Sequence, residues 1–133
     1  EIPEAATRLM AEIWPGDLTL VFSARPDVPE ILTAGTGKIG IRVPGHPVAA
    51  ALVEAAAFPI TGTSANLAGD PGAVQIQDLP AEIADHVDLI LDAGPLKGGA
   101  GSTVVDVSAD SPRVLREGTI LGADIEPFLK MQC

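Results

Sequence analysis

Short stretches with helical or strand periodicity follow one another along this chain, and turns containing proline or glycine separate them. Ile2–Ile13 carries apolar side chains at the spacing of a helix. Pro15 and Gly16 end that helix, because proline cannot continue it and glycine permits a tight turn. Asp17–Ser23 then alternates apolar and other side chains, as a strand does. Such a mixture predicts an α/β (α+β-like) fold with a central sheet.

The remaining elements are predicted in the same way. We expect further strands at Lys38–Val43, Asp88–Asp92, Ser102–Val107 and Pro112–Glu117, a very short one at Ile60, and helices over Val48–Phe58, Leu79–Val87 and Ile125–Met131. The apolar residues of Asp88–Asp92 are expected to be buried. We see no internal repeat and no linker, so residues 1–133 are predicted to form a single domain.

Composition and charge exclude several classes of protein. Of the 133 residues, 47% are apolar, which is enough for a hydrophobic core and excludes a disordered chain. No apolar run approaches the length of a membrane span. The net charge of −10 argues against a broad nucleic-acid-binding surface. The one cysteine, Cys133, is terminal and suggests neither a disulfide nor a metal cluster, so a cytoplasmic location is expected.

The segment Pro59–Gly69 is rich in small hydroxyl and amide side chains flanked by glycine. Such residues let a ligand approach the backbone and offer hydrogen bonds to phosphate or carboxylate oxygens. An ordinary polar turn has the same composition, so the segment alone supports both interpretations about equally.

Two further places suggest ligand contacts. In Lys38–Val43, strand alternation places Gly40 and Arg42 on one face, where glycine would make room and arginine would bind an anion. An exposed arginine at a strand end is the simpler alternative and is favoured about two to one. Asp92–Ser102 is a glycine-rich loop that matches neither phosphate-binding fingerprint, and it places the Ser102 hydroxyl at the start of a strand.

Conventional catalytic signatures are missing. His46 lies in a proline-glycine turn without a nucleophile nearby in sequence, and the two histidines and one cysteine do not form a metal-ligand pattern. The few basic residues next to strands or glycines could still form a basic pocket in an acidic protein; they are Lys38, Arg42, Lys97 and Arg116.

Six motifs in register resemble the YrdC/Sua5 family over nearly the whole chain. They are Trp14-Pro15-Gly16 with Leu18-Thr19-Leu20-Val21, Ile41-Arg42-Val43-Pro44 with His46-Pro47, Thr63-Ser64-Ala65-Asn66-Leu67 with Gly69, Asp92-Ala93-Gly94-Pro95, Ser102-Thr103-Val104-Val105-Asp106, and Leu115-Arg116 with Gly118. The resemblance implies a twisted, mixed parallel and antiparallel open sheet with flanking helices. It also implies synthesis of L-threonylcarbamoyladenylate from L-threonine, bicarbonate or CO2, and ATP, with release of pyrophosphate, for N6-threonylcarbamoyladenosine modification of tRNA.

The resemblance also assigns residues. Arg42, Gly62 and Ser102 match positions that contact L-threonine, and Lys38, Ser64, Asn66, Gly72 and Arg116 match positions around ATP. Lys38 stands where the family more often has a small hydroxyl residue, and Gly72 where it often has serine. No side chain is expected to act as a covalent nucleophile, because adenylyl transfer depends on positioning and charge neutralisation.

One part of the family pattern is not found. The N-terminal loop of the type Pro-Thr-Asp/Glu-Thr-x-Tyr-Gly and the Lys-x-Arg motif that binds the ATP phosphates have no counterpart here. We therefore expect a YrdC-like domain without its N-terminal portion, and weak or absent activity if this chain is the whole polypeptide.

Partners follow from the same resemblance. ATP is expected to carry Mg²⁺, and tRNA and the threonylcarbamoyl-transfer complex are expected partners, whereas a membrane is not. Two alternatives stay open: a carbamoyl-transferring module of the hydrogenase-maturation type, and a non-catalytic RNA-binding module.

Overall fold

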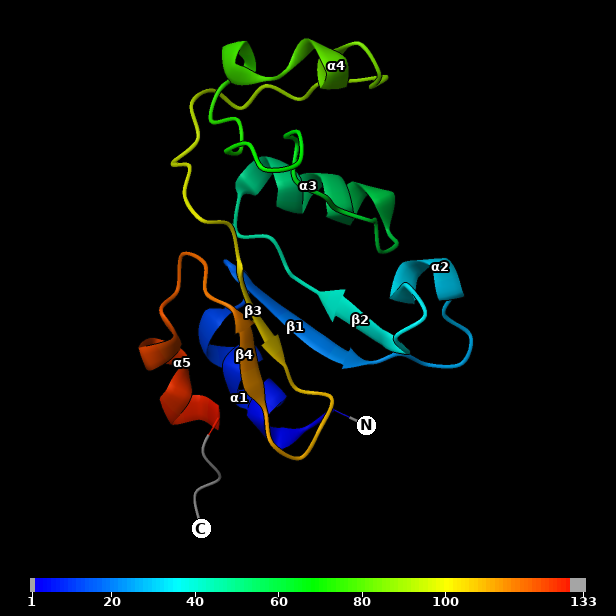
Figure 1. The fold of residues 1–133 in the computed structure, drawn as a ribbon, viewed down its shortest axis with the longest axis vertical. Coiled ribbons are helices and arrows are strands. Elements are labelled where there is room, and N and C mark those ends of the chain that lie inside the picture. Colours follow the sequence, from blue (N-terminus) through cyan, green and yellow to red (C-terminus); the bar gives the residue numbers. More distant parts are fainter. Residues whose placement is uncertain (1, 130–133) are drawn as a thin grey trace. The chain divides into compact units, whose positions relative to one another are not determined.

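A computed structural model describes residues 2–129 (Figure 1). The chain divides into two compact units, one formed by residues 1–46 and 100–133 and the other by residues 47–99. The single domain expected over residues 1–133 stays a prediction, because a division into compact units does not define domains.

The first unit is built on a mixed four-stranded sheet with the order β2-β1-β3-β4. Its strands are β1 (Leu18–Ser23), β2 (Lys38–Ile41), β3 (Thr103–Asp106) and β4 (Arg113–Arg116). β1 pairs antiparallel with β2 and parallel with β3, whereas β3 and β4 pair antiparallel. The predicted mixed open sheet is confirmed, and each of these strands lies within a range that periodicity predicts.

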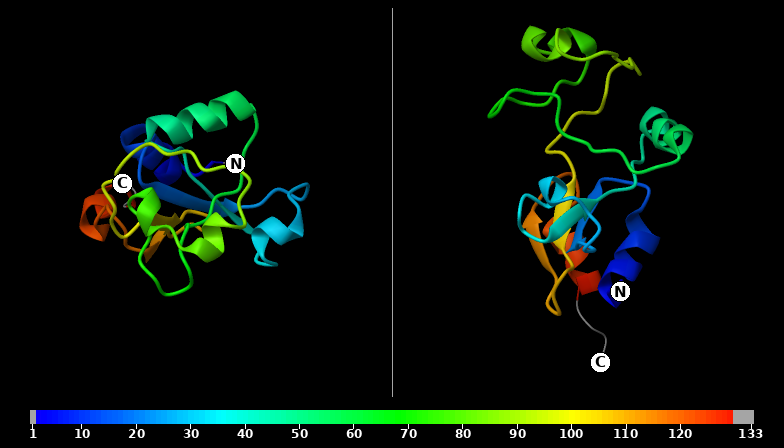
Figure 2. Two further views of the ribbon diagram at one scale, coloured as in Figure 1. Left: turned by 90° about the horizontal axis from the view of Figure 1, so that it is seen from above. Right: turned by 90° about the vertical axis from the view of Figure 1, so that its right-hand side faces the viewer.

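One face of this sheet forms the hydrophobic core, which helices α1 (Glu4–Ile13) and α5 (Gly122–Leu129) cover. Figure 2 shows α1, in blue, running alongside the sheet. The buried core side chains come from β1, from β3 and the residue after it, and from both helices: Ala6, Leu9, Leu18, Leu20, Val105, Val107 and Ile125. Each fully buried leucine stabilises the fold by about 1.5–3 kcal/mol. The core therefore depends on the strand alternation that the sequence predicts.

The opposite face of the sheet is polar. Thr19 and Val21 alternate with the buried leucines of β1, so their side chains lie on the other side. The strand register pairs Val21 with Gly40 and with Asp106. We call this side of the sheet the polar face; it carries Thr19, Val21, Lys38, Gly40, Val104, Asp106, Arg113 and Arg116.

Short helices and loops make up the rest of the structure. α2 (Glu30–Thr33) interrupts the connection between β1 and β2. The second unit contains α3 (Pro47–Ala56), the 3-10 helix η1 (Ile76–Asp78) and α4 (Ala81–Ala84), joined by long loops. Among residues 2–129, no helix combines the length and the apolar character that crossing a membrane requires.

Several predictions for residues 47–99 are wrong. The expected strands at Ile60 and Asp88–Asp92 do not form, and Leu89 is 75% exposed. The expected helix Leu79–Val87 is reduced to α4. The physical reason is that a strand needs a neighbour to satisfy its backbone, and this unit contains no strand for either apolar run to pair with.

A glycine contact holds the start of β3. A Cβ atom added to Gly118 would overlap the carbonyl oxygen of Gly101 and the backbone of Ser102. The amide of Thr119 also donates a hydrogen bond to the Gly101 carbonyl, at 2.9 Å. The loop after β4 is therefore packed backbone against backbone on the residues that lead into β3.

We expect Gly118→Ala to lower the free energy of unfolding by about 1–3 kcal/mol, because the backbones must separate to admit the methyl group. Urea denaturation followed by circular dichroism measures the change. Gly62→Ala is the matched control, since a Cβ atom there meets nothing within 4 Å. Equal stability of the two variants would contradict the close approach described here.

Candidate functional site

Arg42 lies at one end of the polar face, directly after β2. Its Nε donates a hydrogen bond to the carbonyl oxygen of Gly16 at 2.9 Å, and its Nη2 forms an ion pair with Asp17. The predicted neighbour Gly40 shares this face, and a Cβ atom added to it would lie 3.2 Å from Cγ2 of Thr19. The guanidinium is thus held at the start of β1, where the turn after α1 enters the sheet.

Ser102 lies next to this position, immediately before β3, and is only 7% exposed. Its hydroxyl is 2.8 Å from the hydroxyl of Thr19. Nη2 of Arg116 donates to the Ser102 carbonyl at 2.8 Å and lies 3.5 Å from its hydroxyl. Because β1 and β3 are parallel, both hydroxyls meet at the same end of the sheet.

A register shift in β4 brings Arg116 to this place. Val104 pairs with Arg116 and Val105 with Val114, so Leu115 has no partner across the ladder. A residue inserted in this way reverses the side on which the following side chain lies. As a result Arg113 and Arg116, three residues apart, both lie on the side of Asp106 and Val104.

Three of the sequence-predicted site residues therefore gather within the first unit: Arg42, Ser102 and Arg116. The arrangement offers two guanidinium groups and a buried hydroxyl at one end of the polar face. Sequence reasoning missed two residues of this arrangement: Thr19, which contacts Ser102, and Asp17, which contacts Arg42. The alternation of β1 could have found Thr19, since it lies on the side opposite Leu18 and Leu20.

Lys38 lies at the other end of the polar face. It begins β2, four residues before Arg42, a separation of about 13 Å along a strand. Its Nζ forms an ion pair with Oδ2 of Asp106 at 2.8 Å, and Asp106 is 4% exposed. The amide and the hydroxyl of Ser108 both donate to Oδ1 of Asp106, at 2.9 and 2.6 Å.

Those contacts change the acidity of the buried carboxyl group. Hydrogen bonds from Lys38 and Ser108 outweigh burial and lower the pKa of Asp106 from its ordinary value of 3.8 to about 2. The sequence assigns Asp106 no role of its own. Lys38 is thus engaged in an ion pair that links β2 to β3 across β1.

The other predicted site residues lie in loops of the second unit: Gly62, Ser64 and Gly72, which are exposed, and Asn66, which is partly buried. The Asn66 amide donates to the carbonyl oxygens of Leu67 at 2.9 Å and Asp70 at 3.0 Å. It therefore shapes its own loop. A Cβ atom at Gly62 or Gly72 would meet nothing within 4 Å. Their assignment to threonine or ATP stays a prediction.

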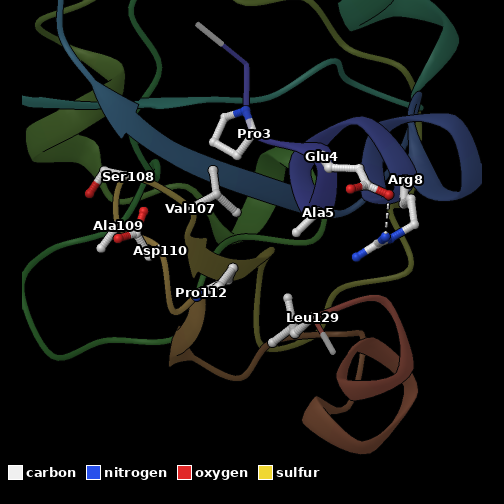
Figure 3. Close-up of a pocket in the computed structure, with 10 residues that line it drawn as sticks. All are labelled: Pro3, Glu4, Ala5, Arg8, Val107, Ser108, Ala109, Asp110, Pro112 and Leu129. Carbon is white, nitrogen blue, oxygen red and sulfur yellow. Dashed lines mark hydrogen bonds and ion pairs between the residues drawn. The ribbon is translucent and has the colours of Figure 1, made fainter. Parts of the chain in front are cut away.

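A separate pocket of about 330 Å³ lies in the first unit (Figure 3). It is lined by residues of α1, of the turn after β3 and of α5, and the Glu4–Arg8 ion pair at 2.8 Å lies at its rim. None of the predicted site residues lines it. Within residues 2–129, no group of three or more histidine, cysteine, aspartate or glutamate side chains is arranged to hold a metal ion.

We expect Asp106→Asn to lower the free energy of unfolding at pH 7 by about 1–3 kcal/mol, because the Lys38 ammonium loses a buried charged partner. The folded pKa of Asp106, about 2, lies below its ordinary value of 3.8. The stabilisation of the fold by the Asp106 carboxylate is therefore complete above about pH 4, and it is lost as the pH falls toward 2. Urea denaturation of both proteins between pH 7 and pH 2 measures this.

The control for this prediction is Asp27→Asn. Asp27 pairs with Arg25 at 3.0 Å, but both side chains are more than two-thirds exposed, so the change should be small. The depressed pKa of Asp106 would be contradicted if the free energies of unfolding of Asp106→Asn and the natural chain differ by the same amount from pH 7 down to pH 2.

Comparison with known proteins adds a second line of evidence. Residues 1–118 match the family model of Sua5, YciO and YrdC proteins, whose description is telomere recombination. Threonylcarbamoyl-AMP synthase of Bacillus subtilis is 39% identical over 96% of this chain and 37% of its own length. YciO of Escherichia coli, described as uncharacterized, is 39% identical over 96% of this chain and 61% of its own.

Solved structures agree with the sequence comparison. The crystal structure of Pyrococcus abyssi Sua5 complexed with L-threonine superposes with a TM-score of 0.87 and 35% identity, covering 97% of this chain and 38% of that one. The crystal structure of E. coli YciO gives a TM-score of 0.82. The chain thus spans 37% of the B. subtilis protein, 38% of the P. abyssi protein and 61% of YciO. With a family model matched over residues 1–118, the resemblance is confirmed: the chain belongs to the Sua5/YciO/YrdC family.

Proposed function

We propose that this chain acts as an L-threonylcarbamoyladenylate synthase on L-threonine, bicarbonate or CO2, and ATP, and releases pyrophosphate. Relatives that share 35–39% of its residues are named threonylcarbamoyl-AMP synthase, in B. subtilis and in P. abyssi. The P. abyssi protein has been crystallised with L-threonine. The whole activity is a proposal for this chain, because the chain spans 37–38% of those two proteins.

The observation that carries the proposal is the meeting of Arg42, Ser102 and Arg116 at one end of the polar face. Arg42 would bind the threonine carboxylate, since a guanidinium forms charge-assisted hydrogen bonds to both oxygens. Ser102 would contact the same substrate through its hydroxyl. Arg116, which donates to the Ser102 carbonyl, would place a positive charge near the nucleotide.

This set of residues suits the chemistry of adenylyl transfer. A carbamate oxygen of N-carboxythreonine attacks the α-phosphorus of ATP, and the bond from that phosphorus to the pyrophosphate oxygen breaks. The step needs orientation and cations near the phosphates more than a covalent nucleophile. Mg²⁺ would arrive with ATP as part of the substrate.

The remaining assignments belong to the same proposal. Gly62 would contact threonine, and Ser64, Asn66 and Gly72 would contact ATP. Lys38 would also face the nucleotide, although its ammonium already donates one hydrogen bond to Asp106. The product would be used in N6-threonylcarbamoyladenosine formation on tRNA by a cytoplasmic threonylcarbamoyl-transfer complex.

The test is pyrophosphate release from ATP by this chain, measured with and without L-threonine and bicarbonate. We expect release to require both. Arg42→Ala should lower kcat/KM for threonine by about tenfold to hundredfold, because a hydrogen bond to a charged group contributes about 1.5–3 kcal/mol. Arg25→Ala, in the exposed pair with Asp27, is the matched control and should behave as the natural chain.

Two outcomes would contradict the proposal. One is a folded chain that neither releases pyrophosphate nor binds threonine in calorimetry. The other is activity that depends on carbamoyl phosphate in place of threonine and bicarbonate, which would favour a carbamoyl-transferring module. Salt-sensitive tRNA binding without either activity would favour an RNA-binding module.

A further inference from the structure

The turn at Gly16–Asp17, between α1 and β1, is tied to two other parts of the first unit. The Gly16 amide donates to the Val43 carbonyl at 2.9 Å, and the Thr103 amide donates to the Asp17 carbonyl at 2.9 Å. A Cβ atom at Gly16 would overlap the carbonyl oxygen of Ile13, so the turn needs glycine there. The Asp17 side chain therefore projects from a backbone that its neighbours hold in place.

Arg42 meets this turn through one edge of its guanidinium group. Nε donates to the Gly16 carbonyl and Nη2 pairs with the Asp17 carboxylate. These two nitrogens share the side edge of the planar group. The other edge of the group is formed by Nη1 and Nη2. Among the residues that the structure describes, Nη1 of Arg42 donates no hydrogen bond. A guanidinium held in this way presents a two-nitrogen fork in one direction.

We propose that Asp17 is a positioning residue: it holds Arg42 by the Nε–Nη2 edge and so directs the Nη1–Nη2 edge toward the carboxylate of the amino-acid substrate. The inference rests on the proposed function, because it assumes that Arg42 binds that carboxylate. It adds Asp17, which neither the family resemblance nor the comparisons assign.

The contact differs from an ordinary surface pair. Arg25 and Asp27, two residues apart, are 82% and 68% exposed in their side chains. Arg42 and Asp17 are 36% and 49% exposed, and they join two elements that lie 25 residues apart in the chain. A half-exposed pair adds little to the stability of the fold. Its effect is on the arginine side chain, which loses most of its rotamer freedom before the substrate binds.

Asp17 could act in the opposite sense, as a carboxylate that competes with the substrate for Arg42. The two roles predict opposite results. If Asp17 positions Arg42, its removal weakens threonine binding, because the guanidinium must then be ordered by the substrate. If Asp17 competes, its removal strengthens binding. The geometry favours positioning, because Gly16 and Asp17 contact the Nε–Nη2 edge of Arg42 and leave the Nη1–Nη2 edge for the substrate.

The experiment compares Asp17→Ala, Asp17→Ser and Asp17→Asn in the full chain, with Asp27→Ala as the control. Calorimetric titration with L-threonine and, separately, with ATP gives both affinities. Asp17→Ala and Asp17→Ser should weaken threonine binding by about threefold to tenfold, the range expected when a long side chain must be ordered again. ATP affinity should not change. Asp17→Asn keeps an acceptor oxygen and should stay within about twofold of the natural chain.

A second readout follows Arg42 itself. In ¹⁵N NMR spectra, the Nε–H signal of Arg42, assigned by its loss in Arg42→Lys, should be sharp in the natural chain and in Asp17→Asn. It should broaden or disappear in Asp17→Ala and Asp17→Ser. Asp17→Ala and Asp17→Ser are both included so that poor folding of one does not decide the result.

Tighter or unchanged threonine binding in Asp17→Ala or Asp17→Ser would overturn the positioning role, as would an Nε–H signal that is the same in all variants. A natural chain that binds no threonine would contradict the proposed function instead. In that case the Nε–H signal alone decides whether Asp17 orients Arg42.

Discussion

Strand β1 is the element on which the first unit depends, because it pairs with β2 on one side and β3 on the other. Its alternation sends Leu18 and Leu20 into the core and Thr19 onto the polar face. The parallel pairing with β3 joins residues more than 80 positions apart, which brings the Thr19 hydroxyl to Ser102. Without that pairing, Leu18 and Leu20 would not pack against β3, and Ser102 would lose its contact with Thr19.

Each cation of the polar face that the family resemblance assigns to a ligand is held by a partner. Lys38 pairs with Asp106, Arg42 with Asp17, and Arg116 donates to the Ser102 carbonyl. Groups oriented in advance bind and stabilise developing charge without being reorganised by the substrate. Under the proposed function, this orientation would let a chain with a net charge of −10 offer a local site for anions. Under the same proposal, Asp106 and Asp17 would set the direction of Lys38 and Arg42.

The structure brings some of the predicted site residues together, and their roles toward threonine and ATP stay predictions. Residue types and strand alternation suggested an anion-binding face around Gly40 and Arg42, although an exposed arginine at a strand end was the favoured alternative. The glycine loop before β3 indicated that the Ser102 hydroxyl could meet a ligand. The structure brings Arg42, Ser102 and Arg116 to one end of the sheet. The predictions for Gly62, Ser64, Asn66 and Gly72 remain untested. Those residues lie in loops, where no periodic pattern constrains the position of a side chain.

The sequence by itself determined the elements whose stability comes from nearby residues: the amphipathic α1, the sharp end of that helix at Pro15 and Gly16, and the alternating strands of the sheet. Only the tertiary structure decided which side chains meet. The unpaired Leu115 turns Arg116 onto the polar face, and Asp106 and Asp17 find cations far from them in the chain. In the tertiary structure of the described residues, the apolar run Asp88–Asp92 also has no strand to pair with. The reason is that periodicity reports contacts within a few residues, whereas strand pairing and ion pairs join distant segments.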